Sequence, residues 1–237
     1  MQLPYFPLHT VLYPHLPLPL EIFEERYRAM TADLVAEGSA YAGRFVVSMI
    51  TEGPEVGGDA IAQPIGTICE VHSAEQRPDG RWLLLVVGVA RARLGAIDRS
   101  GPYAVVDAVA LDEPIGDAAA TLVPRVQSAL DDYLATVKRF VVRTASVGEH
   151  APENPDVTAS LDEVLKPIRL PDDPVAASYA VGGVLQVELI RKQRLLELPD
   201  AAVRLNAELE LLQRETRLLD DGAMPPIPPS DLGYHPN

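Results

Sequence analysis

The chain has 237 residues and carries 20 Lys and Arg against 34 Asp and Glu, which gives a formal net charge of −14 at pH 7. A surface this acidic repels phosphate backbones and disfavours nucleic acid as a partner. Hydrophobic residues make up 47% of the chain, which is enough for a packed core. Cys69 is the single cysteine, so the sequence excludes an internal disulfide and a thiolate-rich zinc site and predicts a reducing cytoplasm.

The first twenty residues are apolar and uncharged, and five of them are prolines. This proline density and the lack of basic residues fit neither a secretory signal nor a membrane span. Because proline has no backbone N–H, the sequence predicts an edge or first strand over residues 3–8 and an extended loop of polyproline character over residues 13–19.

A helix is predicted directly after this loop. Apolar side chains recur there at the spacing of one helical face, at Phe23, Tyr27, Met30 and Leu34. Acidic residues in the first turn suit the positive end of the helix dipole, and Gly38 is a suitable end for the helix.

Residues 44–111 have the pattern of β-structure. Apolar or β-branched runs are separated by Gly, Pro and Asp turns, and the runs cover residues 45–50, 66–72, 82–94 and 103–111. Together with residues 3–8 they give about five or six strands, a number that suits a small closed or partly closed antiparallel barrel carrying one helix. The first domain is therefore expected at residues 1–115.

The pattern becomes helical after about residue 116. Helices are predicted over residues 123–143, from an N-cap at Asp173-Pro174 to about residue 188, and over residues 200–219. We expect a loop at residues 144–159, a helical bundle at 116–222 and a disordered tail at 223–237. A leucine stripe on the last helix favours packing within the bundle, with self-association as the alternative, so a monomer or weak homo-oligomer is expected.

Five short motifs, taken together and in order, point to a family. They are Phe6-Pro7-Leu8, Phe23-Glu24-Glu25-Arg26-Tyr27, Gly66-Thr67, Gly88-Val89-Ala90-Arg91 and Lys192-Gln193-Arg194-Leu195-Leu196-Glu197. This series resembles the recurring elements of the N-terminal, substrate-binding domain of Lon proteases. The resemblance covers nearly the whole chain outside its expected tail.

The resemblance implies an α+β fold, with an N-terminal PUA-like antiparallel β pseudo-barrel that carries one helix and a C-terminal α-helical bundle. It also implies a stand-alone, non-catalytic recognition module. The implied partners are unfolded or extended protein segments, or one dedicated protein partner, and no membrane is involved.

The residue patterns of catalysis are missing from the sequence. None of the three lysines follows a glycine, so no phosphate loop of an ATPase is present. No serine lies in a Gly-x-Ser-x-Gly elbow, and the five histidines lack the spacing of metal ligands. The sequence therefore predicts no enzyme activity, no catalytic residue, no cofactor and no metal.

The loop before the first predicted helix is the candidate binding site. Apolar loops beside a barrel edge can bind extended peptides through backbone hydrogen bonds and side-chain pockets. From this argument and from the role of the Lon domain in engaging substrates, we predict a peptide site at Leu12, Tyr13, His15 and Leu16. Burial of all four side chains in the barrel would exclude it.

A second function stays open, because other PUA-like barrels bind RNA or small ligands. It would be favoured by clustering of four arginines on one barrel face, namely Arg44, Arg81, Arg91 and Arg93. Arg91 and Arg93 alternate along one predicted strand and are possible ligand contacts. The simpler interpretation of these two is ion pairing with the carboxylates of the first predicted helix.

Overall fold

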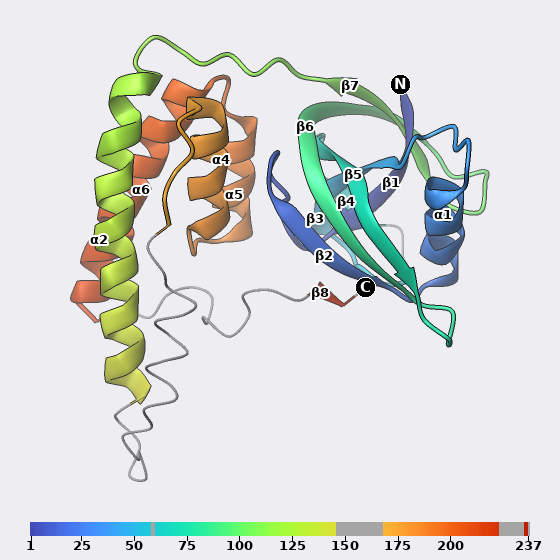
Figure 1. Ribbon diagram of the computed structural model, residues 1–237, viewed down its shortest axis with the longest axis horizontal. Helices are drawn as coiled ribbons and strands as arrows, with labels where there is room; N and C mark the ends of the chain where they lie inside the picture. Colours follow the sequence, from blue (N-terminus) through green and yellow to red (C-terminus); the bar gives the residue numbers. More distant parts are fainter. Residues whose placement is uncertain (58–59, 146–167, 223–234, 237) are drawn as a thin grey trace. The chain divides into compact units, whose positions relative to one another are not determined.

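The computed structural model describes residues 1–57, 60–145, 168–222 and 235–236 (Figure 1). Residues 146–159 of the predicted loop and most of the predicted tail lie outside the described residues. The chain divides into two compact units. The first contains residues 1–113, 188–197 and 228–237, and the second contains residues 114–187 and 198–227.

The first unit is a β-structure with two helices among its described residues. Its elements are β1 (Gln2–Leu8), β2 (Pro17–Ile22), α1 (Glu25–Val35), β3 (Arg44–Glu52), β4 (Ile61–Ala62), β5 (Ile65–Gln76), β6 (Trp82–Asp98), β7 (Val105–Ala110), α5 (Leu189–Glu197) and β8 (His235–Pro236). With the helices of the second unit, these elements confirm the predicted α+β fold.

Five of the strands close into a ring, which is visible in Figure 1 as a strongly curved barrel. β3 pairs with β1, β1 with β7, β7 with β6, β6 with β5, and β5 again with β3. All of these pairs are antiparallel except β1 with β3. Closure removes the free edges of these five strands and leaves β2, β4 and β8 outside the ring.

β2 lies against the first half of β6, in antiparallel register from Pro17 opposite Val87 to Ile22 opposite Trp82. The predicted loop over residues 13–19 is therefore wrong for its last three residues. Pro17 and Pro19 are exposed, whereas Leu18 between them is buried, so the segment alternates as a strand does. Proline is tolerated in β2 because its missing N–H falls on the side away from β6.

α1 packs on the barrel core through Tyr27, Met30 and Leu34, as its apolar spacing predicts. The ring of Tyr27 meets that of Phe6 edge to face, with 4.2 Å between centroids. Phe23 precedes the helix and is only partly buried.

The second unit is helical in its described residues. It contains α2 (Ala119–Ala145), α4 (Pro174–Val184) and α6 (Ala201–Asp220). Asp173 caps α4 by accepting the Ala176 N–H at 2.9 Å, and Asp200 caps α6 by accepting the Val203 N–H at 2.8 Å. Among the described residues, no helix combines the length and apolarity needed to cross a membrane.

The helix predicted from Asp173 to about residue 188 is shorter in the structure. α4 ends at Val184, just after the pair Gly182-Gly183, whose backbone entropy disfavours continued helix. The next helix, α5, begins at Leu189. It belongs to the first compact unit, although its residues lie within the stretch predicted as the helical bundle.

A buried acid lies on α6 in the second unit. Glu208 is fully buried, and neither of its carboxyl oxygens has a hydrogen-bond partner among the described residues. Arg204, one turn earlier, is also fully buried; it donates to the Ser178 hydroxyl at 2.8 Å and stacks on the Tyr179 ring at 4.0 Å. Burial raises the pKa of Glu208 well above its ordinary value, and the positive charge of Arg204 offsets only part of this.

Glu208 is therefore expected to make stability depend on pH. Since its pKa is higher in the folded state, its contribution is fully present below the ordinary pKa and is lost as the pH rises through the folded one. Glu208→Gln should gain stability relative to the natural chain as the pH rises above the ordinary pKa of glutamate, measured by chemical unfolding. Glu210→Gln, exposed on the same helix, is the control and should follow the natural chain. Parallel pH profiles for all three proteins would contradict the prediction.

Candidate functional site

The loop between β1 and β2 is held on the barrel by hydrogen bonds to backbone carbonyls. The Thr67 hydroxyl donates to the Leu12 carbonyl at 2.5 Å, and the Tyr13 hydroxyl donates to the Lys192 carbonyl at 2.8 Å. The His15 N–H donates to the Gly88 carbonyl at 2.8 Å. The loop is thus fixed in the first unit rather than free to rearrange.

Gly88 permits this arrangement because the loop crosses β6 in direct contact with its backbone. A Cβ at position 88 would lie 2.2 Å from the Tyr13 carbonyl oxygen and 3.0 Å from the Pro14 Cα. Both are backbone atoms, so no side-chain rotation could relieve the overlap. The glycine of the Gly-x-x-Arg motif is therefore a packing requirement of the loop.

α5 completes the frame around the loop. The Gln193 side-chain amide donates to the Ile65 carbonyl at 2.9 Å, and Leu195 and Leu196 are buried. Burial lowers the pKa of Lys192 to about 8. The Lys-Gln-x-Leu-Leu-Glu motif thus holds α5 against β5 and gives Tyr13 its acceptor.

Arg91 is part of the same frame. Its side chain is only 3% exposed and reaches the Glu113 carboxylate at 2.7 Å, the Leu196 carbonyl at 2.9 Å and the Asp112 carbonyl at 3.0 Å. The predicted ion pair between Arg91 and a carboxylate of α1 is therefore wrong. Arg91 pairs with Glu113, because β6 directs its side chain toward α5 and toward the residues that follow β7. A side chain this buried holds the fold together and is not accessible to a ligand. Of the two possible ligand contacts, Arg91 and Arg93, only Arg93 is exposed.

The four residues of the predicted peptide site differ in accessibility. Leu12 and Tyr13 are buried, with 5% and 1% of their surface exposed. His15 is exposed and adopts a left-handed backbone with a φ of 67°, and Leu16 is partly exposed. Only His15 and Leu16 are therefore placed to contact a ligand, while the other two hold the loop.

An apolar surface runs along the outside of β2 and β6, next to Leu16. Cross-strand partners share a face of a sheet, so the register places Pro17 beside Val87, Pro19 beside Leu85 and Glu21 beside Leu83. Leu84 and Val86 point into the core, which turns the alternate residues outward. We call the outward group the β2–β6 surface, defined by Pro17, Pro19, Leu83, Leu85 and Val87, all of them exposed or partly exposed. Leu16 lies at its border and packs against the barrel core.

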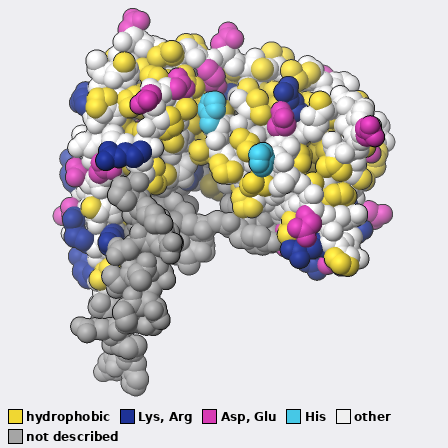
Figure 2. Space-filling model, viewed as in Figure 1, with side chains coloured by type: hydrophobic (Ala, Val, Ile, Leu, Met, Phe, Trp, Pro, Cys, Tyr) yellow, Lys and Arg dark blue, Asp and Glu magenta, His cyan; other side chains and the backbone are white. Residues whose placement is uncertain are grey.

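The β2–β6 surface is bordered by ion pairs. Arg81 contacts Glu21 at 3.0 Å, and Arg44 contacts Glu70 at 3.0 Å. On the face of the molecule drawn in Figure 2, hydrophobic side chains likewise lie among both acidic and basic ones. An apolar strip with a charged rim is the general anatomy of a protein-binding surface.

Three of the four arginines of the RNA alternative are buried or ion-paired, and the fourth, Arg93, is exposed. Arg44 and Arg81 pair with glutamates, and Arg81 also contacts Asp79 at 3.1 Å. Arg91 is buried with its own carboxylate partner. An ion-paired guanidinium must break its pair to bind a phosphate, and a buried one cannot reach it, so phosphate binding gains little free energy at these positions. This set therefore does not form a phosphate-binding face.

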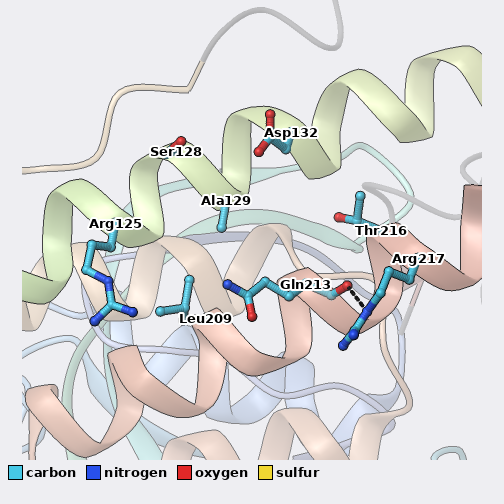
Figure 3. A pocket seen from close by; sticks show the side chains of 8 residues that line it. All are labelled: Arg125, Ser128, Ala129, Asp132, Leu209, Gln213, Thr216 and Arg217. Carbon is cyan, nitrogen blue, oxygen red and sulfur yellow. Dashed lines mark hydrogen bonds between the residues drawn. The ribbon is translucent and has the colours of Figure 1, made fainter.

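A separate groove of about 530 Å³ lies between α2 and α6 in the second unit (Figure 3). Ala129 and Leu209 supply its apolar part, and polar side chains supply the rest. Arg217 at one end donates to the Gln213 carbonyl at 3.0 Å. The groove has few apolar side chains for a ligand to bury.

Comparison with known proteins identifies the family. Residues 2–214 match the family described as the ATP-dependent protease La (LON) substrate-binding domain. The chain belongs to this family. The match runs across both compact units and confirms the resemblance drawn from the short motifs.

Curated relatives are Lon proteases. The Lon protease of Escherichia coli strain K12 is 27% identical over 92% of this chain, and that of Trichlorobacter lovleyi is 26% identical over 92%. The chain spans only 26% and 24% of the length of these two relatives. The LON substrate-binding domain is thus the part that they share with this chain.

Solved structures of LON substrate-binding domains have the same fold. The N-terminal domain of Mycobacterium avium complex Lon protease superposes with a TM-score of 0.59 at 18% identity, covering 90% of this chain and 98% of that domain. A Lon N-terminal domain protein from Xanthomonas campestris gives 0.58 at 19% identity, with 89% and 98% covered.

Sequence reasoning missed the β2–β6 surface, although a signal for it was present. Residues 83–87 read Leu-Leu-Leu-Val-Val without a polar residue. A strand with one face in water normally alternates between apolar and polar residues, so an unbroken apolar run indicates that both faces meet apolar partners. One face of this run lines the core, and the other is the β2–β6 surface.

Proposed function

We propose that this chain is a non-catalytic recognition module that binds extended segments of unfolded polypeptides at the β2–β6 surface, with His15 and Leu16 at its border. The observation that carries the proposal is an apolar strip on the outside of a rigid barrel in a member of a substrate-binding domain family. Unfolded clients expose apolar side chains of this kind, and their burial drives binding.

The frame around the loop supports the proposal. A bound segment loses conformational entropy, so affinity is greatest when the receiving surface is already ordered. Gly88, Arg91 and Gln193 fix the loop and α5 through close packing and hydrogen bonds to backbone carbonyls. The residues of the family motifs thus pre-organise the surface rather than contact the client.

The double substitution Leu85→Ser with Val87→Ser is the direct test. It removes apolar contact area from the centre of the surface and should weaken binding of fluorescently labelled casein by about tenfold or more, measured by anisotropy. Val109→Ser on β7 is the matched control, because Val109 is 65% exposed on the same barrel but lies away from β2. Equal affinities for the double variant, the control and the natural chain would refute the site.

Salt dependence separates this function from RNA binding. The charges bordering the surface are already paired, so casein binding should change little between low and physiological salt. Binding through phosphate contacts would instead weaken steeply over that range. A steep salt dependence, with RNA competing against casein, would favour the alternative.

A further inference from the structure

The outer edge of β2 already carries a paired segment. β2 has β6 on one side, and on the other side it pairs in parallel with β8, the two residues His235–Pro236 (Figure 1). The register places Leu20 opposite His235 and Glu21 opposite Pro236. The edge of β2 can therefore accept an added strand.

The backbone groups on this edge can be assigned from the ladder with β6. The Gly88 N–H donates to the Leu16 carbonyl at 3.0 Å, so Leu16 faces β6. Successive residues of a strand turn their backbone polar groups to opposite sides, and the groups of Pro17, Pro19 and Glu21 therefore face outward. Within Pro17–Ile22, Glu21 is the residue that offers an outward N–H, because the two prolines have none.

This pattern restricts what can pair with β2. The edge offers carbonyl acceptors at Pro17, Pro19 and Glu21, and one N–H donor at Glu21. In a parallel ladder, a residue bonds to the residues on either side of the one opposite, so the position opposite Glu21 needs no N–H. Pro236 occupies that position. Edge prolines also protect β2 from indiscriminate pairing with other strands.

We infer that the β2 edge is a strand-addition site, at which an extended segment of an unfolded polypeptide pairs parallel to β2 while its side chains pack on the β2–β6 surface. This inference rests on the proposed function and gives its binding mode. Residues 235–236 occupy the same edge within the chain, so they compete with the client. Backbone hydrogen bonds then supply affinity without demanding a particular client sequence.

A pair of substitutions at position 21 isolates the backbone contribution. Glu21→Pro removes the outward N–H without removing a bond to β6, and Glu21→Ala removes the side chain and its exposed pairing with Arg81 but keeps the N–H. Casein binding should weaken about tenfold in Glu21→Pro and stay within about twofold in Glu21→Ala. Equal affinities for the two variants would overturn strand addition.

A variant that ends at Gly222 provides a second test that leaves β2 unchanged. It lacks β8, so casein should bind it about threefold or more tightly than it binds the natural chain. A synthetic peptide of residues 223–237 should bind this variant and compete with casein. If casein binds both proteins equally and the peptide does not compete, strand addition fails while the proposed function stands. If casein binds neither protein, the proposed function fails and the inference with it.

Discussion

Arg91→Met is expected to lower the free energy of unfolding by about 2–3 kcal/mol, because it removes a buried guanidinium that bonds a partly buried carboxylate and two backbone carbonyls. The substitution leaves the Glu113 carboxylate without its cation, and the carbonyls of Asp112 and Leu196 without the guanidinium that now bonds them. Methionine restores much of the volume but none of these bonds. Chemical unfolding followed by circular dichroism measures the change.

Arg93→Met is the matched control for this prediction. Arg93 lies on the same strand two residues later, but it is exposed. Exposed substitutions away from caps and buried networks usually change stability by less than about 0.5 kcal/mol. If the two variants unfolded at similar denaturant concentrations, the buried network of Arg91 would not carry the stability assigned to it.

Gly88→Ala is expected to cost about 1–3 kcal/mol of stability and to displace the loop. The added methyl group would lie 2.2 Å from the Tyr13 carbonyl oxygen, so β6 and the loop must separate. This separation would weaken the hydrogen bond from His15 to Gly88 and disturb the start of β2. Casein affinity should fall with stability, because the β2–β6 surface depends on both strands.

Gly95→Ala is the matched control. It distinguishes the steric overlap at position 88 from the general effect of replacing a glycine by alanine. Gly95 also lies on β6, and a Cβ there would lie 3.3 Å from the Asp107 Cβ, so β6 and β7 would need to separate by only a few tenths of an ångström. Since alanine reduces the entropy of the unfolded chain, Gly95→Ala should be neutral or cost less than about 1 kcal/mol. A loss at Gly95 as large as that at Gly88 would contradict the close approach of the loop.

Local patterns in the sequence predict most elements of the fold. The apolar spacing of α1 and the N-cap at Asp173 correspond to the structure because both depend on residues within one or two turns. The prolines of β2 misled the prediction, since proline argues against a strand unless its outward edge is known. That edge is defined by pairing with β6, some seventy residues away.

The candidate site is less predictable than the fold. The prediction chose a loop that lies on the barrel, but Tyr13 of this loop is buried, and its hydroxyl reaches the Lys192 carbonyl, a partner 179 residues away. Arg91 likewise finds Glu113 and Leu196 rather than α1. No local pattern encodes such partners. The motif residues themselves were recognisable, and the structure shows that they hold the loop and α5 in place.

Hydrogen exchange of the natural chain, with and without saturating casein, tests the central claim most directly. If the β2–β6 surface receives extended segments, casein should slow exchange at amides of residues 16–22 and 83–89 while leaving α2 and α6 unchanged. Protection confined to α2 and α6, or no protection at saturating casein, would contradict the account.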